Sequence, residues 1–109
     1  ILLQDMQGGL QVLNKDNIWS EAPPIENSFV CNNCDLLERW TNGDLISTKH
    51  RVINRNKNAR YSIPIFCDPS SQTIINPSDF SQSPNKFEKI TAGEHILNRN
   101  RRNFKQYKK

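Results

Sequence analysis

The sequence predicts a mainly β domain with two short helices, and three observations support this fold class. Short apolar or alternating runs are separated by turn-forming residues, as expected of the strands of a sandwich or jelly roll. Two segments have the residue spacing of a capping box, which starts a helix. The sequence shows no repeat, and its 109 residues are enough for at most one domain.

The first predicted strands precede the internal helix. Ile1–Leu3, Leu10–Leu13 and Phe29–Cys31 are short apolar or alternating runs of the kind found in strands. Pro23-Pro24 separates the last two runs. Because the chain opens inside an apolar run and its only Met stands at position 6, we expect a segment of a longer protein.

A short internal helix is predicted to begin at Asp35. Asp35 can cap the helix, and Glu38 completes the capping box three residues later. Gly43 follows the predicted end, where a glycine commonly terminates a helix. One face of the helix is apolar, so we expect Trp40 to be buried.

Two further strands are predicted on either side of a polar turn. The first is His50–Ile53, the turn is Asn54–Ala59 and the second strand is Arg60–Cys67. Proline has no backbone N–H, so Pro64 makes the middle of the second strand an edge or a bend.

The last third of the chain combines a loop with a C-terminal helix. Asp68–Asn85 is rich in Ser, Pro and Asn and reads as loop, apart from the β-like run Thr73–Ile75. Thr91 and Glu94 form the second capping box, and His95 is expected on the surface of the helix that follows. The side chains predicted to form its apolar side are Ile96, Leu97 and Phe104.

Charge and cysteine usage limit the partners and the compartment. Residues 86–109 carry 8 of the 15 Lys and Arg but 2 of the 11 Asp and Glu. This basic end is explained equally well by a solvated helix face and by an acidic partner. We do not expect it to bind nucleic acid. No apolar run reaches the roughly 18–20 residues of a membrane span, so no membrane partner is expected. Cys31, Cys34 and Cys67 lack the spacing of a disulfide framework or of a zinc site, which favours the cytoplasm.

His50, Arg60 and Ser62 are the candidate site residues. A neutral imidazole is a good ligand for Fe(II), and a guanidinium two residues from a hydroxyl offers a forked, charge-assisted grip on a carboxylate. On a strand, Arg60 and Ser62 point to the same face. Together the three residues indicate an iron site that holds an organic acid. Periodicity leaves open whether His50 and Arg60 are neighbours in a hairpin or lie on opposite sheets.

Over nearly its whole length the sequence resembles the C-terminal half of the isopenicillin N synthase-like family of Fe(II)/2-oxoglutarate-dependent dioxygenases. The residues that carry the resemblance occur in this order: Leu2-Leu3-Gln4-Asp5, Gly8-Gly9-Leu10-Gln11-Val12, Pro23-Pro24-Ile25, residues 35–43, Ser47-Thr48, His50-Arg51-Val52, Arg60-Tyr61-Ser62-Ile63-Pro64 and Thr91-Ala92-Gly93-Glu94. The resemblance implies part of a double-stranded β-helix (jelly roll), with the β-helix core over 1–80 and a linker and basic helix over 81–109.

The resemblance also implies roles for the candidate residues. His50 matches the distal iron ligand, and Arg60 and Ser62 match the pair that binds the distal carboxylate of 2-oxoglutarate. Fe(II), 2-oxoglutarate, O2 and a small organic substrate are then expected, with succinate as a product. The resemblance favours placing His50 and Arg60 on opposite sheets.

In that family the other two iron ligands form a His-x-Asp motif shortly before the segment matching Leu2–Asp5. We therefore expect the chain to lack them, to need the N-terminal half of the same fold and to be inactive alone. Two alternatives stay open. The Arg/Ser pair could bind a substrate carboxylate instead of 2-oxoglutarate, as in isopenicillin N synthase. The chain could also be a truncated or degenerate dioxygenase-like fold that acts as a non-catalytic interaction module.

Overall fold

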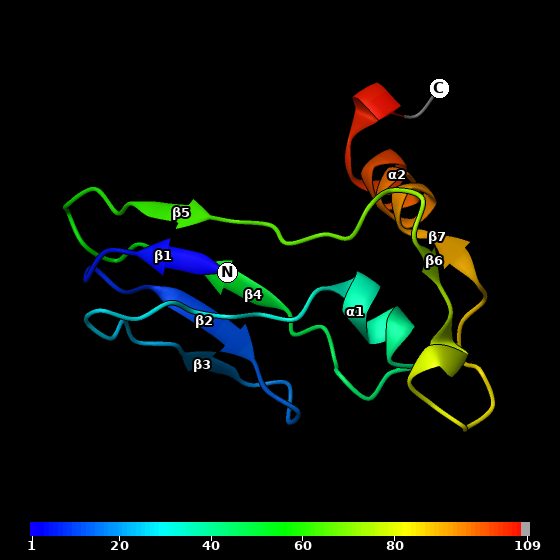
Figure 1. The fold of residues 1–109 in the computed structure, drawn as a ribbon. Helices are drawn as coiled ribbons and strands as arrows, with labels where there is room; N and C mark the ends of the chain where they lie inside the picture. The colour runs from blue at the N-terminus through cyan, green and yellow to red at the C-terminus, as the bar shows by residue number, and fades with distance from the viewer. Residues whose placement is uncertain (108–109) are drawn as a thin grey trace. The chain divides into compact units, whose positions relative to one another are not determined.

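The computed structural model describes residues 1–107 and divides into two compact units. Unit 1 comprises Ile1–Asn32 and Thr48–Cys67, and unit 2 comprises Asn33–Ser47 and the residues from Asp68 onward. Each unit has its own strands (Figure 1). The expected division into a core over 1–80 and a basic segment over 81–109 stays a prediction.

Unit 1 contains two antiparallel sheets. In the first, β1 (Leu2–Gln4) pairs with β5 (Ser62–Pro64). In the second, β2 (Leu10–Leu13) lies between β3 (Trp19–Glu21) and β4 (His50–Val52). The β1-β5 sheet runs above the β3-β2-β4 sheet in the view of Figure 1. The mainly β class and the strands expected at the chain start, at Leu10 and at His50 are confirmed.

Two of the predicted strands differ from the structure: one is absent and the other is shorter than predicted. The prediction for Phe29–Cys31 is wrong, because Val30 makes only an isolated bridge to Leu2. Arg60–Cys67 forms a strand only at Ser62–Pro64. Pro64 has no N–H to offer a second neighbour, and β5 has β1 as its single partner, as expected of an edge strand.

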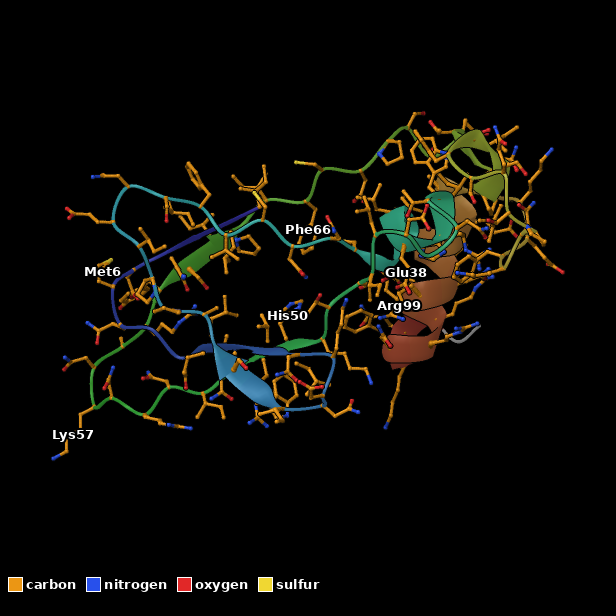
Figure 2. All side chains as sticks on the ribbon, turned by 90° about the horizontal axis from the view of Figure 1, so that it is seen from below. Met6, Glu38, His50, Lys57, Phe66 and Arg99 are labelled. Atoms are coloured by element: carbon orange, nitrogen blue, oxygen red, sulfur yellow. The ribbon has the colours of Figure 1, made fainter. Side chains whose placement is uncertain are left out.

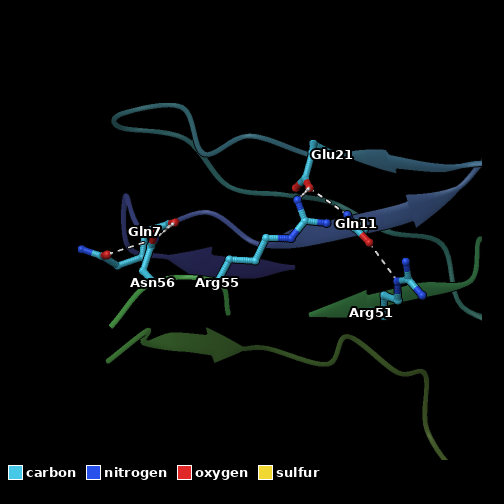
Figure 3. A network of polar contacts seen from close by, with 6 residues as sticks. All are labelled: Gln7, Gln11, Glu21, Arg51, Arg55 and Asn56. Atoms are coloured by element: carbon cyan, nitrogen blue, oxygen red, sulfur yellow. Dashed lines mark hydrogen bonds and ion pairs between the residues drawn. The ribbon is translucent and has the colours of Figure 1, made fainter. Parts of the chain in front are cut away.

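One face of the β3-β2-β4 sheet carries a polar network (Figure 3). Gln11 in the central strand is only 4% exposed; its amide donates to Glu21 Oε1 at 2.7 Å and accepts from Arg51 Nε at 2.8 Å. The Arg51 guanidinium also lies 4.1 Å from the centre of the Trp19 ring, a cation–π contact. Because side chains alternate along a strand, this network leaves His50 on the other face of β4.

Up to residue 107, unit 2 contains two α-helices, two short paired strands and two 3₁₀ turns. They are α1 (Asp35–Trp40), β6 (Ile74–Ile75), η1 (Pro77–Asp79), β7 (Ile90–Thr91), α2 (Ala92–Asn103) and η2 (Lys105–Tyr107). Leu36, Ile75 and Ala92 are buried and form its core, against which Trp40 packs. Trp40 is half-buried, and its indole N–H donates to Asp79 Oδ2 at 2.9 Å. The β-like run at Ile74–Ile75 is confirmed, with β7 as its partner.

The start of α1 differs from the prediction, whereas its end does not. Cys34, in extended conformation at φ −92°, is the N-cap and makes no side-chain capping bond, while Asp35 is the first helical residue. Glu38 is four residues after this N-cap rather than the three of a capping box, and its carboxylate accepts from the Ser47 N–H at 3.1 Å. Gly43 follows the helix at φ +89°, the left-handed conformation expected there.

The helix α2 begins as predicted but packs differently. The Thr91 side chain accepts from the Glu94 N–H at 3.2 Å, which confirms the capping start. Of the residues predicted to form its apolar side, Phe104 lies just after the end of the helix, and Leu97 and Phe104 are 39% and 50% exposed. His95 is not on the surface: its side chain is 14% exposed and lies 3.3 Å from the Asp35 carboxylate. Within residues 1–107, the helices are too short and too polar to cross a membrane.

Candidate functional site

His50 opens β4 in the three-stranded sheet of unit 1, where its side chain is exposed (Figure 2). Its Nδ1 lies 3.2 Å from the Thr48 carbonyl oxygen and 3.2 Å from the Asn32 amide nitrogen. A single ring nitrogen cannot donate to the first and accept from the second at once. The carbonyl can only accept, whereas an Asn amide can turn, so Nδ1–H donating to Thr48 is the favoured arrangement. This leaves a lone pair on Nε2, the state in which imidazole binds a metal.

Arg60 and Ser62 are brought together as their spacing predicts. Arg60 is half-buried, and its Nη1 donates to Ser62 Oγ at 3.1 Å. Its Nε donates to the Gly8 carbonyl at 2.8 Å, and its Nη2 donates to Gln4 Oε1 at 2.9 Å. All three acceptors are neutral. The guanidinium is thus held in place by groups that do not cancel its charge, and an organic anion can do so.

The Asp5 carboxylate lies close to Arg60, but backbone N–H groups, not the guanidinium, are its hydrogen-bond donors. Its two oxygens accept from the Tyr61 N–H at 2.6 Å and the Gln7 N–H at 3.0 Å. The Tyr61 N–H, helped by the Gln7 N–H and the Arg60 charge, lowers the pKa of Asp5 below its usual 3.8 despite partial desolvation. Asp5 is therefore ionised at neutral pH and ties the start of β5 to the end of β1.

His50 lies on a different sheet from Ser62, so the strands β4 and β5 are not neighbours in a hairpin. His50 belongs to β4 in the β3-β2-β4 sheet, and Ser62 belongs to β5 in the β1-β5 sheet. The hydrogen-bond partners of His50 are Asn32 and Thr48, not the Arg60 clamp. A surface hollow of about 280 Å³ follows the β1-β5 sheet and includes neither His50 nor Arg60. Its lining residues are Leu3, Gln4, Asp5, Tyr61, Ser62 and Ile63.

The donor chemistry supports one iron ligand in this chain. His50 is exposed and offers Nε2, so it fits the position of a ligand. Among residues 1–107, no three His, Cys, Asp or Glu side chains are grouped so that they could hold a metal ion.

Three groups around the site go beyond the predicted residues. The Thr48 carbonyl orients His50, while the Gly8 carbonyl and the Gln4 amide orient Arg60. Every residue has a backbone carbonyl, so the sequence does not indicate that those of Thr48 and Gly8 have this role. Gln4 could be found only once the register is known, because β1 and β5 pair Gln4 with Ser62.

Comparison with known proteins assigns the chain to a family. The family model of the 2OG-Fe(II) oxygenase superfamily matches residues 1–69. The chain belongs to this superfamily, whose members use Fe(II) and 2-oxoglutarate, and the resemblance to its isopenicillin N synthase-like branch is confirmed.

Individual relatives agree with this assignment. A probable iron/ascorbate oxidoreductase of Dictyostelium discoideum is 41% identical over 91% of this chain and 31% of its own length. A homoarginine-6-hydroxylase of Glycine max is 36% identical over 92% of this chain and 31% of its own length. The chain thus spans about a third of the length of these relatives.

Solved structures show the same fold relationship. A full-length Neurospora crassa protein in complex with alpha-KG and thymine matches with a TM-score of 0.82 and 37% identity, over 94% of this chain and 34% of that chain. A rice dioxygenase for auxin oxidation matches with a TM-score of 0.80 and 28% identity, over 94% of this chain and 36% of that one. The jelly-roll class predicted from the sequence is confirmed.

Proposed function

We propose that this chain is the C-terminal catalytic-core segment of a non-haem Fe(II)/2-oxoglutarate-dependent dioxygenase that oxidises a small organic molecule. One observation carries the proposal: in a chain of this superfamily, the Arg60 guanidinium is held beside the Ser62 hydroxyl at 3.1 Å by neutral acceptors only. A carboxylate is the planar anion that a guanidinium fork fits best. The distal carboxylate of 2-oxoglutarate is the anion that we assign to Arg60 and Ser62.

In this proposal His50 contributes one ligand to the iron through Nε2. The Thr48 carbonyl, at 3.2 Å from Nδ1, holds the tautomer that keeps Nε2 available. Iron bound there supplies the activation of O2 that couples conversion of 2-oxoglutarate to succinate and CO2 with oxidation of the substrate. The residues of this chain bind and orient the acid and supply one protein ligand.

The rest of the fold completes the site. We propose that the His-x-Asp ligands come from the N-terminal half of the same fold, and that residues 1–80 belong to the β-helix core with 81–109 as a basic C-terminal segment. Exposed apolar side chains on the β1-β5 sheet support a covering partner, because Leu3, Ile63 and Tyr61 are 43%, 60% and 73% exposed. The chain's span of about a third of its relatives' length supports the same view.

The substrate is proposed only as a class. The similar proteins are named for homoarginine and auxin or were crystallised with thymine, and these molecules have small size in common rather than a shared functional group. A small organic molecule and O2 are therefore the partners we propose. The three cysteines are free and exposed, which supports a reducing compartment, and we propose the cytoplasm.

Succinate release tests the proposal. The complete protein, supplied with Fe(II) and 2-oxoglutarate, should release succinate, and His50→Ala should reduce the rate at least about 100-fold because an essential ligand is lost. Residues 1–109 alone should show no turnover. Robust succinate release from that polypeptide would refute the proposed division of ligands, and an unaffected His50→Ala variant would refute the role of His50.

Oxygen uptake tests which acid Arg60 binds. If 2-oxoglutarate is the co-substrate, O2 uptake by the complete protein requires it. Uptake that proceeds at full rate without 2-oxoglutarate would instead assign Arg60 and Ser62 to a substrate carboxylate.

A non-catalytic interaction module is the alternative function. The exposed apolar surface of the β1-β5 sheet favours it as well, since such a surface can bind another protein. The residues encoded immediately upstream distinguish the two functions. A His-x-Asp motif there supports the enzyme, and its replacement by residues that cannot bind iron supports the module.

A further inference from the structure

Gln4 stands directly beside the proposed carboxylate-binding pair. It is the last residue of β1, and the antiparallel register places it opposite Ser62 of β5. Directly opposed residues project their side chains from the same face of a sheet, with Cβ atoms about 5 Å apart. Gln4 and Ser62 therefore form a cross-strand pair, and Arg60 makes a hydrogen bond to each of them.

The hydrogen bonds of Arg60 leave two of its N–H groups for a ligand. A guanidinium has five N–H donors, of which Nε uses its one on Gly8 while each terminal nitrogen uses one, on Ser62 and on Gln4. One N–H thus remains on each terminal nitrogen, as a forked carboxylate contact requires.

The orientation of the Gln4 amide follows from chemistry. A guanidinium can only donate, so the Gln4 atom that lies 2.9 Å from Arg60 Nη2 must be the carbonyl oxygen. The amide nitrogen Nε2, with two N–H donors, is then the other end of the side chain. Within residues 1–107 these donors have no hydrogen-bond partner, and a carboxylate held by Arg60 is an acceptor that can supply one.

We propose that Gln4 is a further carboxylate-recognition residue: it positions Arg60 through Oε1 and donates from Nε2 to the acid that Arg60 binds. This inference rests on the proposed function and deepens it, because Gln4 of β1, Ser62 of β5 and Arg60, just before β5, then surround one carboxylate. The ligand class is a dicarboxylic 2-oxo acid.

The experiment measures KM and kcat for 2-oxoglutarate in the complete protein with Gln4 replaced. Gln4→Glu keeps the shape but pairs a negative charge with Arg60, so KM should rise by roughly 10- to 100-fold. Gln4→Met keeps the length without polar atoms, and KM should rise by roughly 3- to 10-fold. In both variants the loss should appear in KM rather than in kcat.

Gln7→Glu is the matched control. It adds the same charge to the same segment, but Gln7 contacts Asn56 rather than Arg60 (Figure 3), so KM should stay within about twofold. Arg60→Met is measured alongside to test the underlying assignment.

The outcomes separate this inference from the proposed function. A large KM increase in Arg60→Met with wild-type KM values in both Gln4 variants would overturn the role of Gln4 alone. An unchanged KM in Arg60→Met would overturn the assignment of the acid to Arg60. Lower melting temperature and kcat with an unchanged KM in Gln4→Met would assign Gln4 to folding and also overturn the inference.

Discussion

Asp5 joins two strands through a charge whose protonation state depends on pH. The Tyr61 N–H lowers the pKa of Asp5 below 3.8 in the folded protein, so the ionised form is favoured by folding. A group of this kind stabilises the fold above its unfolded pKa of about 3.9, and the contribution is lost as the pH falls through the lower folded pKa. The stabilisation by Asp5 is thus present at neutral pH and disappears in acid.

We predict that Asp5→Asn is less stable than the wild type at pH 7 and that the difference shrinks below about pH 4. Asn replaces one acceptor oxygen with a donor, as protonation also does, so the two proteins converge in acid. Urea unfolding of both proteins between pH 3 and pH 7 measures this. A stability difference that does not depend on pH would contradict the assignment.

Asn42 is a buried polar residue in the turn after α1. It is 1% exposed with φ 54°, its Oδ1 accepts from the Lys86 N–H at 2.7 Å and its amide donates to the Pro84 carbonyl at 3.1 Å. Asn42→Ala would leave both backbone groups without this partner and should cost about 2–4 kcal/mol of unfolding free energy.

Asn17→Ala is the control for Asn42, because Asn17 has nearly the same φ of 58° but is exposed. It should cost about 1–2 kcal/mol, the backbone contribution alone. Equal losses in the two variants would show that the buried hydrogen bonds of Asn42 contribute nothing.

The connection between β1 and β2 depends on two glycines with different surroundings. A Cβ on Gly9, at φ +86°, would lie 2.5 Å from the Ile53 carbonyl oxygen. A Cβ on Gly8, at φ +75°, would meet only the Pro24 Cδ at an ordinary 3.7 Å. The two positions share the backbone strain of a left-handed residue and differ in the clash.

We predict that Gly9→Ala lowers the unfolding free energy by roughly 2–5 kcal/mol and Gly8→Ala by about 1–2 kcal/mol. Thermal and urea unfolding of the two variants measure the difference in unfolding free energy. This difference reports the clash with the Ile53 carbonyl, which only Gly9→Ala introduces. Indistinguishable variants would mean that this close approach of Gly9 to Ile53 is not present in the folded protein.

Elements with a strong local signal could be predicted, and those that depend on pairing could not. Leu10–Leu13 and the Thr91 cap are encoded by neighbouring residues and were found at those positions. The strand β3 was not predicted, although it pairs with β2 across a short turn, and the partner of β6 lies in a more distant segment. Phe29–Cys31 has the composition of a strand, yet only Val30 finds a backbone partner in Leu2.

The candidate site follows the same rule. The contact between Arg60 and Ser62 follows from their two-residue spacing, which is a local property, although the strand itself begins only at Ser62. The position of His50 relative to them depends on the pairing of β4 with β2 and of β5 with β1, which no local pattern contains. Gln4 was not predicted for the same reason.

At the scale of the whole molecule, the exposed apolar face of the β1-β5 sheet predicts burial by the rest of the protein. Ile63 on this sheet and Ile18 in the β2-β3 turn are both 60% exposed in this chain. If the rest of the β-helix covers the sheet, Ile63→Lys should destabilise the complete protein by about 2–3 kcal/mol, the value of a buried aliphatic side chain. Ile18→Lys should stay within about 0.5 kcal/mol.

Chemical unfolding of the complete protein and both variants tests this comparison. Equal, small effects of the two substitutions would show that the sheet stays open to solvent, and the covering half of the fold would then have to lie elsewhere.

Gly8 and Gly9 also bear on the length of the acid that the proposed site can bind. The Gly8 carbonyl accepts from Arg60 Nε at 2.8 Å, and the next carbonyl, of Gly9, accepts from the Ile53 N–H at 2.8 Å, one residue beyond β4. Adjacent peptide planes thus connect the guanidinium to the strand that carries His50. Under the proposed function, this rigid spacer fixes how far an acid must reach from its anchored end to the metal. A homologue of 2-oxoglutarate with one more methylene group should then fit this distance less well.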